Sequence, residues 1–180
     1  GIAAQFPTRI VDHLQQGRAR AIAETPKPND PIFTRVHNVV IGSNELAALA
    51  AADKARQLGY HPLVLTTYLE GEARIVGGVL ANIARELALH DRPVARPAVL
   101  IAGGETTVTL QGTGRGGRNQ ELALGAVQHL AGLPGTALVA LATDGGDGPT
   151  DAAGAVVTGE TLARARSLGL DSEDYLRRND

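Results

Sequence analysis

Hydrophobic residues gather in short continuous runs, and the runs alternate with longer segments in which apolar positions recur every three or four residues. Runs rich in Val, Ile and Leu are typical of buried strands, whereas the second spacing is typical of amphipathic helices. The runs predict strands at residues 36–42, 61–67, 96–104 and 136–144. The helical spacing predicts helices at residues 43–58, 70–90 and 119–131. Because strands and helices alternate, the pattern predicts a parallel sheet with right-handed crossovers.

The helix predicted at 43–58 begins at Ser43 or Asn44, either of which is a favourable N-cap. Its expected apolar stripe consists of Ala47, Ala50, Ala51, Ala55 and Leu58. A further strand is expected at residues 106–110, TTVTL, joined to the run before it by a tight turn at Gly103 and Gly104. The fold class is therefore α/β, a Rossmann-like layered sheet, mostly parallel with a local hairpin, with helices on both faces.

The two ends of the chain carry weaker patterns. A short helix is expected at residues 8–16, and the segment ETPKPNDP at 24–31 is typical of a linker. Residues 155–169 predict a short strand and a helix, and residues 174–180, DYLRRND, show no further element. We therefore expect residues 1–30 to be a remnant helix and linker from a preceding domain, followed by an α/β domain at 31–180.

Composition narrows the class of protein. A chain of 180 residues suits one domain, and its net charge of −2 provides no bulk field for nucleic acid or a membrane. The chain has no Cys, which excludes disulfides and thiolate metal sites and fits a cytoplasmic protein. No apolar run approaches the roughly 18 residues of a membrane span. The absence of any Met favours a fragment or a processed chain over an intact translation product.

The stretch GTGRGGRNQE at residues 112–121 matches two glycine motifs in part. Gly112, Gly114 and Gly117 fit the dinucleotide fingerprint, while the spacing up to Asn119 fits a phosphate loop in which Arg118 replaces the Lys. Placed between a strand and a helix, such a loop offers backbone N–H groups and a positive helix end to an anion. Arg115 and Arg118 add guanidinium groups that can grip a carboxylate or phosphate. The alternative interpretation of this stretch is a turn whose arginines lie in solvent and bind no ligand.

Neither motif is complete. The loop follows the fourth predicted strand, whereas the dinucleotide fingerprint follows the first. No acidic residue stands about 20 residues further on, where it would bind the ribose, so the case for a hydride-transfer enzyme is weaker. Arg118 and Asn119 replace the Lys and the hydroxyl that a phosphate loop uses around Mg²⁺. We interpret the stretch as an anion-binding loop in which Arg118 is the leading residue.

A second candidate region, TDGGDGPTDAAG at residues 143–154, carries Asp144 and Asp147 at the carboxyl end of a predicted strand. Ligands of open α/β sheets bind at such ends, and carboxylates suit Mg²⁺. Turn formation alone would also explain these residues. Glu105 and Thr106 follow another strand and either join the same pocket or lie in a solvated turn. The five His residues are scattered without ligand spacing, so we assign them no role.

Together, the blocks LEGEAR, GGETTVTLQGTGRGGRNQELAL and ATDGGDGPTDAAGAVVTGET resemble the class II glycerate kinases, whose carboxyl-terminal part is the MOFRL domain. Members have also been named hydroxypyruvate reductase. The resemblance runs from about residue 24 to the end. It implies that residues 31–180 are a MOFRL-like domain, incomplete at the carboxyl end, and that an amino-terminal domain of the same enzyme is missing.

The resemblance further implies transfer of the ATP γ-phosphoryl group to the 2-hydroxyl of glycerate, giving 2-phosphoglycerate, with Mg²⁺ as the metal. The isolated fragment is expected to be inactive, and a homodimer is a further expectation. Arg118 would be catalytic, and Asp144 and Asp147 would hold the metal. The residues expected to bind substrate or phosphate are Gly104, Glu105, Thr106, Gly114, Arg115, Gly116, Gly117, Asn119 and Glu121. A hydroxypyruvate reductase that uses NAD(P)H and a non-catalytic module that binds small anions remain as alternatives.

Overall fold

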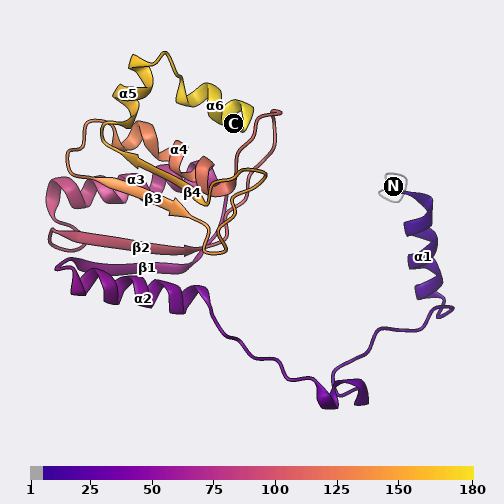
Figure 1. Cartoon of the computed structure of the whole chain (residues 1–180). Helices are drawn as coiled ribbons and strands as arrows, with labels where there is room; N and C mark the ends of the chain where they lie inside the picture. Colours follow the sequence, from indigo (N-terminus) through magenta and orange to yellow (C-terminus); the bar gives the residue numbers. More distant parts are fainter. Residues whose placement is uncertain (1–5) are drawn as a thin grey trace. The chain divides into compact units, whose positions relative to one another are not determined.

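The computed structural model of the chain describes residues 6–180 and divides the chain into two units, Gly1–Ile41 and Gly42–Asp180 (Figure 1). In the first unit, the helix α1 (Thr8–Arg18) confirms the short helix expected there. The 3-10 helix η2 (Pro31–Arg35) ends an irregular stretch that contains the predicted linker. Asp30 begins η2, because its carboxylate accepts a hydrogen bond from the Ile32 N–H.

The strand predicted at residues 36–42 is absent from the structure. Val39, Val40 and Ile41 are 75%, 81% and 95% exposed, and the residues around them have no regular secondary structure. A β-branched run becomes a strand only when another strand satisfies its backbone N–H and C=O groups. Within residues 6–180, none pairs with this run, so local preference alone leaves it extended and irregular.

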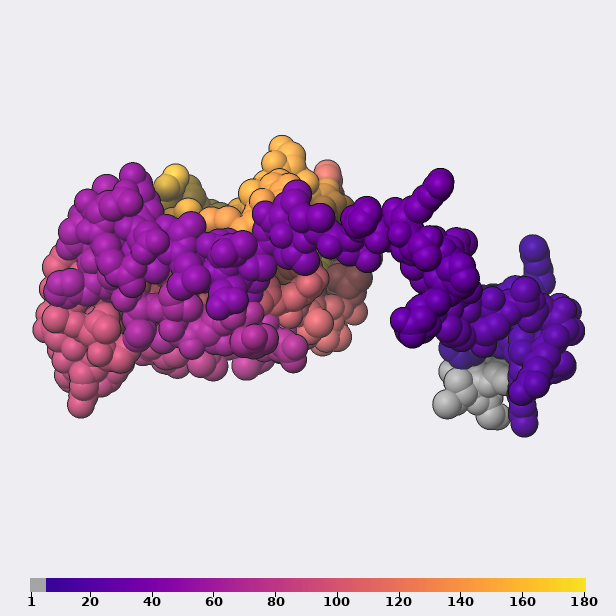
Figure 2. Space-filling model, turned by 90° about the horizontal axis from the view of Figure 1, so that it is seen from below, coloured from indigo at the N-terminus to yellow at the C-terminus, as the bar shows by residue number. Residues whose placement is uncertain are grey.

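The second unit begins with a helix on a two-stranded parallel sheet. The helix α2 (Asn44–Gln57) starts at Ser43, whose hydroxyl accepts from the Leu46 N–H at 3.1 Å. It packs on β1 (His61–Leu69) and β2 (Ala98–Gly104), and the register runs from His61 opposite Ala98 to Leu69 opposite Gly104. Figure 2, which is seen from below the view of Figure 1, shows the purple segment of α2 on the face toward the viewer. Ala48, Ala52 and Ala55 form its buried face, so the predicted stripe is wrong except at Ala55.

The main core lies between α3 (Ala73–His90) and α4 (Arg118–Leu130). The two helices approach closely because glycines face the partner: a Cβ at Gly77 would meet the Leu122 carbonyl, and one at Gly125 would meet Arg74. Small and branched side chains fill the contact, including Ala81, Ala123, Ala126, Val127 and Leu130. This small-residue packing explains how a chain with 3% aromatic residues builds a close-packed core.

The other side of α4 packs on a second pair of strands. Strands β3 (Ala137–Leu141) and β4 (Gly154–Thr158) are antiparallel and are joined by the acidic loop that follows β3. Two short helices complete the unit, α5 (Thr161–Ser167) and α6 (Ser172–Arg178). The sequence pattern anticipated every one of these elements except α6.

The fold is mixed α/β, as expected, but the single layered sheet is not formed by the described residues. They form two two-stranded sheets, β1 with β2 and β3 with β4. The hairpin at Gly103 and Gly104 is wrong, because residues 106–110 make one bridge, between Thr107 and Glu72, in place of a strand. Among residues 6–180, no helix combines the length and the apolar character needed to cross a membrane.

Candidate functional site

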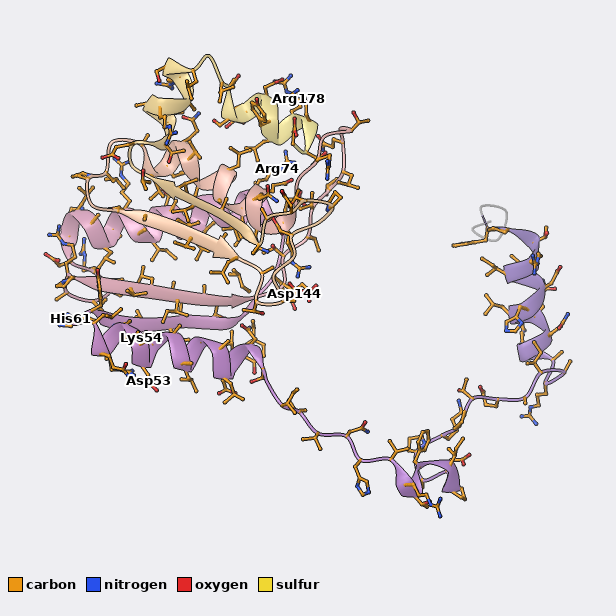
Figure 3. The ribbon with its side chains drawn as sticks, in the orientation of Figure 1. Asp53, Lys54, His61, Arg74, Asp144 and Arg178 are labelled. Atoms are coloured by element: carbon orange, nitrogen blue, oxygen red, sulfur yellow. The ribbon has the colours of Figure 1, made fainter. Side chains whose placement is uncertain are left out.

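A cleft of about 570 Å³ in the second unit collects most of the predicted site residues. Gly114, Gly116, Gly117, Arg118 and Glu121 line the cleft from the glycine loop and the start of α4, and Thr106 lines it from the segment after β2. Asp144 and Asp147 line it from the acidic loop, and Figure 3 labels Asp144 beyond the end of β3. The structure therefore brings Arg118 and the two aspartates to one cavity, which is the arrangement that the sequence predicts for an anion site.

Four other predicted residues, Gly104, Glu105, Arg115 and Asn119, are outside the lining of the cleft. Gly104 is held against β1, where an added Cβ would meet the backbone of Leu69. Its φ of 155° is one that L side chains rarely adopt. Arg115 donates from Nη2 to the Pro149 carbonyl at 2.6 Å. Gly104 and Arg115 thus shape the loops around the cleft.

A carboxylate of the protein accepts hydrogen bonds from the backbone N–H groups at the start of α4. Oδ1 of Asp147 accepts from the backbone N–H and the side-chain amide of Asn119, both at 3.0 Å. Oδ2 accepts from the backbone N–H of Gln120 at 2.8 Å and from its Nε2 at 3.1 Å. Asp147 is 1% exposed, and a Cβ at Gly117 would collide with its carboxylate. The anion at this helix N-terminus is therefore Asp147 itself.

Two residues with predicted ligand-binding roles, Asn119 and Asp147, bond to each other in this geometry. Asn119, expected to bind substrate or phosphate, donates hydrogen bonds from its backbone N–H and its side-chain Nδ2 to Asp147. Asp147, expected to hold a metal, uses both carboxylate oxygens to accept four hydrogen bonds. The sequence interpretation missed this cap because the partners are 28 and 27 residues apart in the chain.

Burial opposes ionisation of Asp147, but the N–H groups of Asn119 and Gln120 stabilise the carboxylate more strongly, so its pKa is lowered. A lowered pKa in the folded state adds stability above the unfolded pKa of about 4, and this stability is lost as the pH falls through the lower folded pKa. Asp147→Asn should therefore destabilise the protein at pH 7, and the difference from wild type should shrink below about pH 4. Urea unfolding of both proteins between pH 7 and pH 3 measures this. A difference that is constant with pH would contradict it.

Arg118 begins α4 and carries its guanidinium to the cleft. Nη1 lies 2.9 Å from Oε1 of Glu105, and the two side chains are 41% and 76% exposed. An ion pair so exposed contributes little, about 1 kcal/mol or less, because water screens it. An incoming anion can therefore replace the Glu105 carboxylate on Arg118 at small cost. Thr106, next to Glu105, is 8% exposed and lines the cleft.

Glu121 has a different environment from the one expected of a substrate ligand. It is 7% exposed, and its Oε1 accepts from Nε of Arg74 at 2.7 Å. Its Oε2 accepts from Nδ2 of Asn179 at 3.3 Å. Both carboxylate oxygens thus accept hydrogen bonds from other residues of the protein. The side chain of Glu121 therefore connects Arg74 and Asn179 beside the cleft. Arg74, labelled in Figure 3, and Asn179 are members of this network that the sequence analysis missed.

Of the two aspartates predicted to hold a metal, Asp144 is the one whose carboxylate has room for further ligands. It is exposed, and its Oδ1 accepts one hydrogen bond, from the Gly146 N–H at 3.3 Å. Among the described residues, 6–180, no three His, Cys, Asp or Glu side chains gather as a metal site of protein ligands requires. A metal ion here would need oxygen ligands from a substrate or from water.

The segments that form this cleft match a known protein family. Residues 98–180 match the model of the MOFRL family. Over these residues the chain is a member of the MOFRL family. The match contains the glycine loop, α4, the acidic loop and α6, which are the segments that build the cleft. The relatives extend the similarity to the segment before residue 98.

The chain is similar to the glycerate 2-kinase of Pyrococcus horikoshii, with 42% identity over 177 residues, 98% of this chain and 39% of the relative. A putative hydroxypyruvate reductase of Agrobacterium vitis is 43% identical over 159 residues, 87% of this chain and 36% of the relative. The crystal structure of glycerate kinase from Thermotoga maritima superimposes with a TM-score of 0.77 at 45% identity, covering 78% of this chain and 34% of that one. The chain thus spans less than two fifths of the length of these relatives.

Proposed function

We propose that this MOFRL chain forms part of a glycerate 2-kinase, which transfers the γ-phosphoryl group of ATP to the 2-hydroxyl of D-glycerate. The observation that carries the proposal is the exposed guanidinium of Arg118 at a cleft that also contains Asp144. Phosphoryl transfer develops charge on equatorial oxygens and requires positioning and electrostatic stabilisation more than covalent chemistry by the protein. A guanidinium that an anion can reach supplies that stabilisation.

Arg118 and Glu105 would act as a pair. In the structure, Glu105 is the partner of the guanidinium; in the complex, the carboxylate of glycerate or the transferring phosphoryl group would take that place. A bidentate contact to either group suits the planar fork of arginine. Glu105 carries the same charge as the substrate, so its part is to orient the guanidinium.

Mg²⁺ would enter with the nucleotide. The ion commonly keeps several waters and is held by one or two carboxylates plus phosphate oxygens. Asp144 fits that requirement, since it is exposed at the cleft and makes one hydrogen bond. The ion would neutralise charge on the phosphates. The remaining ligands for ATP and glycerate would come from a further part of the protein, since this chain covers 39% of one relative and 34% of another.

The hydroxypyruvate reductase alternative requires a nicotinamide dinucleotide, and one observation disfavours it. A dinucleotide fold places the pyrophosphate on free backbone N–H groups at the start of the helix after the glycine loop. Here the N–H groups of Asn119 and Gln120 already donate to the buried carboxylate of Asp147. A pyrophosphate at the same place would meet a negative charge.

ADP release by the full-length protein with ATP, Mg²⁺ and D-glycerate tests the proposal. The kinase proposal expects ADP formation that depends on glycerate and 2-phosphoglycerate as the product. The parallel assay mixes NADH with hydroxypyruvate without ATP, and steady loss of NADH there would overturn the proposal in favour of the reductase. Glycerate binding with neither reaction would identify a non-catalytic binding module.

A further inference from the structure

Asn179 occupies a central position beside the cleft. It follows α6 with a φ of 56°, in the left-handed region, and is 6% exposed. Its Oδ1 accepts from the backbone N–H groups of Gln111 at 2.6 Å and Gly112 at 2.8 Å. Its Nδ2 donates to the Thr109 carbonyl at 3.2 Å and to Glu121 at 3.3 Å. A carboxamide offers two acceptor and two donor positions, and all four are used.

Three of these hydrogen bonds fix the backbone at the start of the glycine loop, which is taken from here on to include the preceding residues 107–111. This loop has no strand partner of its own apart from the bridge at Thr107. Glu72 holds it from the side of α3, through the backbone N–H and the hydroxyl of Thr109, both at 3.0 Å. Asn179 holds the next residues from the side of α6. The Gly114 N–H also donates to the Arg178 carbonyl at 2.9 Å.

The fourth hydrogen bond connects the loop to the helix that carries Arg118. Glu121 lies three residues after Arg118 on α4, and residues at this spacing are neighbours on a helix surface. Asn179 therefore contacts both the loop that lines the cleft and a side chain one turn from the guanidinium. Displacement of this carboxamide would let the loop and Arg118 move independently.

We propose that Asn179 is a positioning residue of the phosphoryl-transfer site, which fixes the glycine loop relative to Arg118. The proposal rests on the proposed kinase function, and it concerns geometry: Asn179 lines the cleft but acts through the loop and Glu121. The residue type fits, because Asn tolerates the left-handed conformation better than other non-glycine residues and also supplies the carboxamide.

Asn179→Gly is the decisive variant, because glycine keeps the backbone conformation and removes only the side chain. Ser172→Ala is the matched control. Ser172 is also on α6 and accepts from Nε2 of Gln128 on α4 at 3.1 Å, but its side chain forms no hydrogen bond with the glycine loop. If Asn179→Gly acted only by loosening α6 from α4, it would have the same effect as Ser172→Ala.

In the full-length protein, Asn179→Gly should accelerate hydrogen exchange at the amides of Gln111 and Gly112 and lower kcat for ADP release about 100-fold, the effect of a displacement of about 1 Å. KM for glycerate should change little, because the lost positioning acts in the transition state. Ser172→Ala should leave exchange and kcat at wild-type values. Asn179→Asp keeps the acceptor for Gln111 and Gly112 but faces Glu121 with a second carboxylate, so it should keep amide protection and still lose rate.

Unchanged exchange at Gln111 and Gly112 in Asn179→Gly would overturn the proposal, as would an equal loss of rate in Ser172→Ala. Failure of the kinase function is distinguishable from either result. In that case the wild-type protein itself releases no ADP with glycerate, while the exchange measurement still reports whether Asn179 holds the loop.

Discussion

Replacing Arg118 with alanine in the full-length protein should lower kcat for ADP release from ATP and glycerate about 10³-fold, the effect expected when an arginine that stabilises a transferring phosphoryl group is lost. The guanidinium is the cationic group of α4 that reaches the cleft, and its partner Glu105 is exposed and exchangeable. Steady-state kinetics with saturating ATP and Mg²⁺ measure the effect. The folded state should be unaffected, because an exposed ion pair contributes little to stability.

Two variants test whether this effect belongs to the guanidinium at 118. Arg115→Ala removes the neighbouring guanidinium, which donates to the Pro149 carbonyl and lies outside the cleft lining, so it should cost much less rate. Glu105→Gln removes the charge of the partner but leaves Arg118 in place, so most of kcat should remain. Near-wild-type kcat in Arg118→Ala would remove the residue from the mechanism, and an equal loss in Arg115→Ala would indicate a general need for positive charge.

Elements with a clear apolar period were predictable from the sequence. The runs that became β1, β2 and β3 combine branched apolar residues with flanking turn residues, and α3 and α4 carry apolar positions at helical spacing. The run at 36–42 has the same local character, yet it forms no strand, because strand formation requires a pairing partner. The helix α6 was missed although Asp171 and the acidic first turn are ordinary start signals, and Asp171 caps it by accepting from the Glu173 N–H.

The composition of the candidate site was predictable, but the division of its roles was not. Glycines, arginines and acids near strand ends predict a cleft for anions, and Arg118 and Asp144 do line one cleft of the structure. Which acid faces the ligand depends on contacts between distant residues. Asp147 is buried and accepts four hydrogen bonds from Asn119 and Gln120. Glu121 is buried and accepts hydrogen bonds from Arg74 and Asn179. No local pattern distinguishes these acids from the exposed Asp144.

Breaking the mostly buried ion pair between Arg74 and Glu121 should produce the largest loss of stability. Their side chains are 21% and 7% exposed, and Nε of Arg74 lies 2.7 Å from Oε1 of Glu121. Arg74→Ala leaves a carboxylate without its charge partner between two packed helices, which should lower the free energy of unfolding by about 3–5 kcal/mol. Urea unfolding at pH 7 measures the change. Arg56→Ala is the matched control, because Arg56 pairs with Asp53 at the surface of α2 and should change stability by about 0.5 kcal/mol or less.

A second substitution separates the cost of an unpaired charge from the loss of contacts by Arg74. In the double variant Arg74→Ala with Glu121→Gln, the residue at 121 is neutral and can still accept from Asn179, so part of the lost stability should return. No recovery would mean that the packing of the arginine stem, rather than the ion pair, stabilises the contact between α3 and α4. Recovery would instead show that Arg74 neutralises the carboxylate to which Asn179 is bonded, linking the core between the helices to the position of the glycine loop.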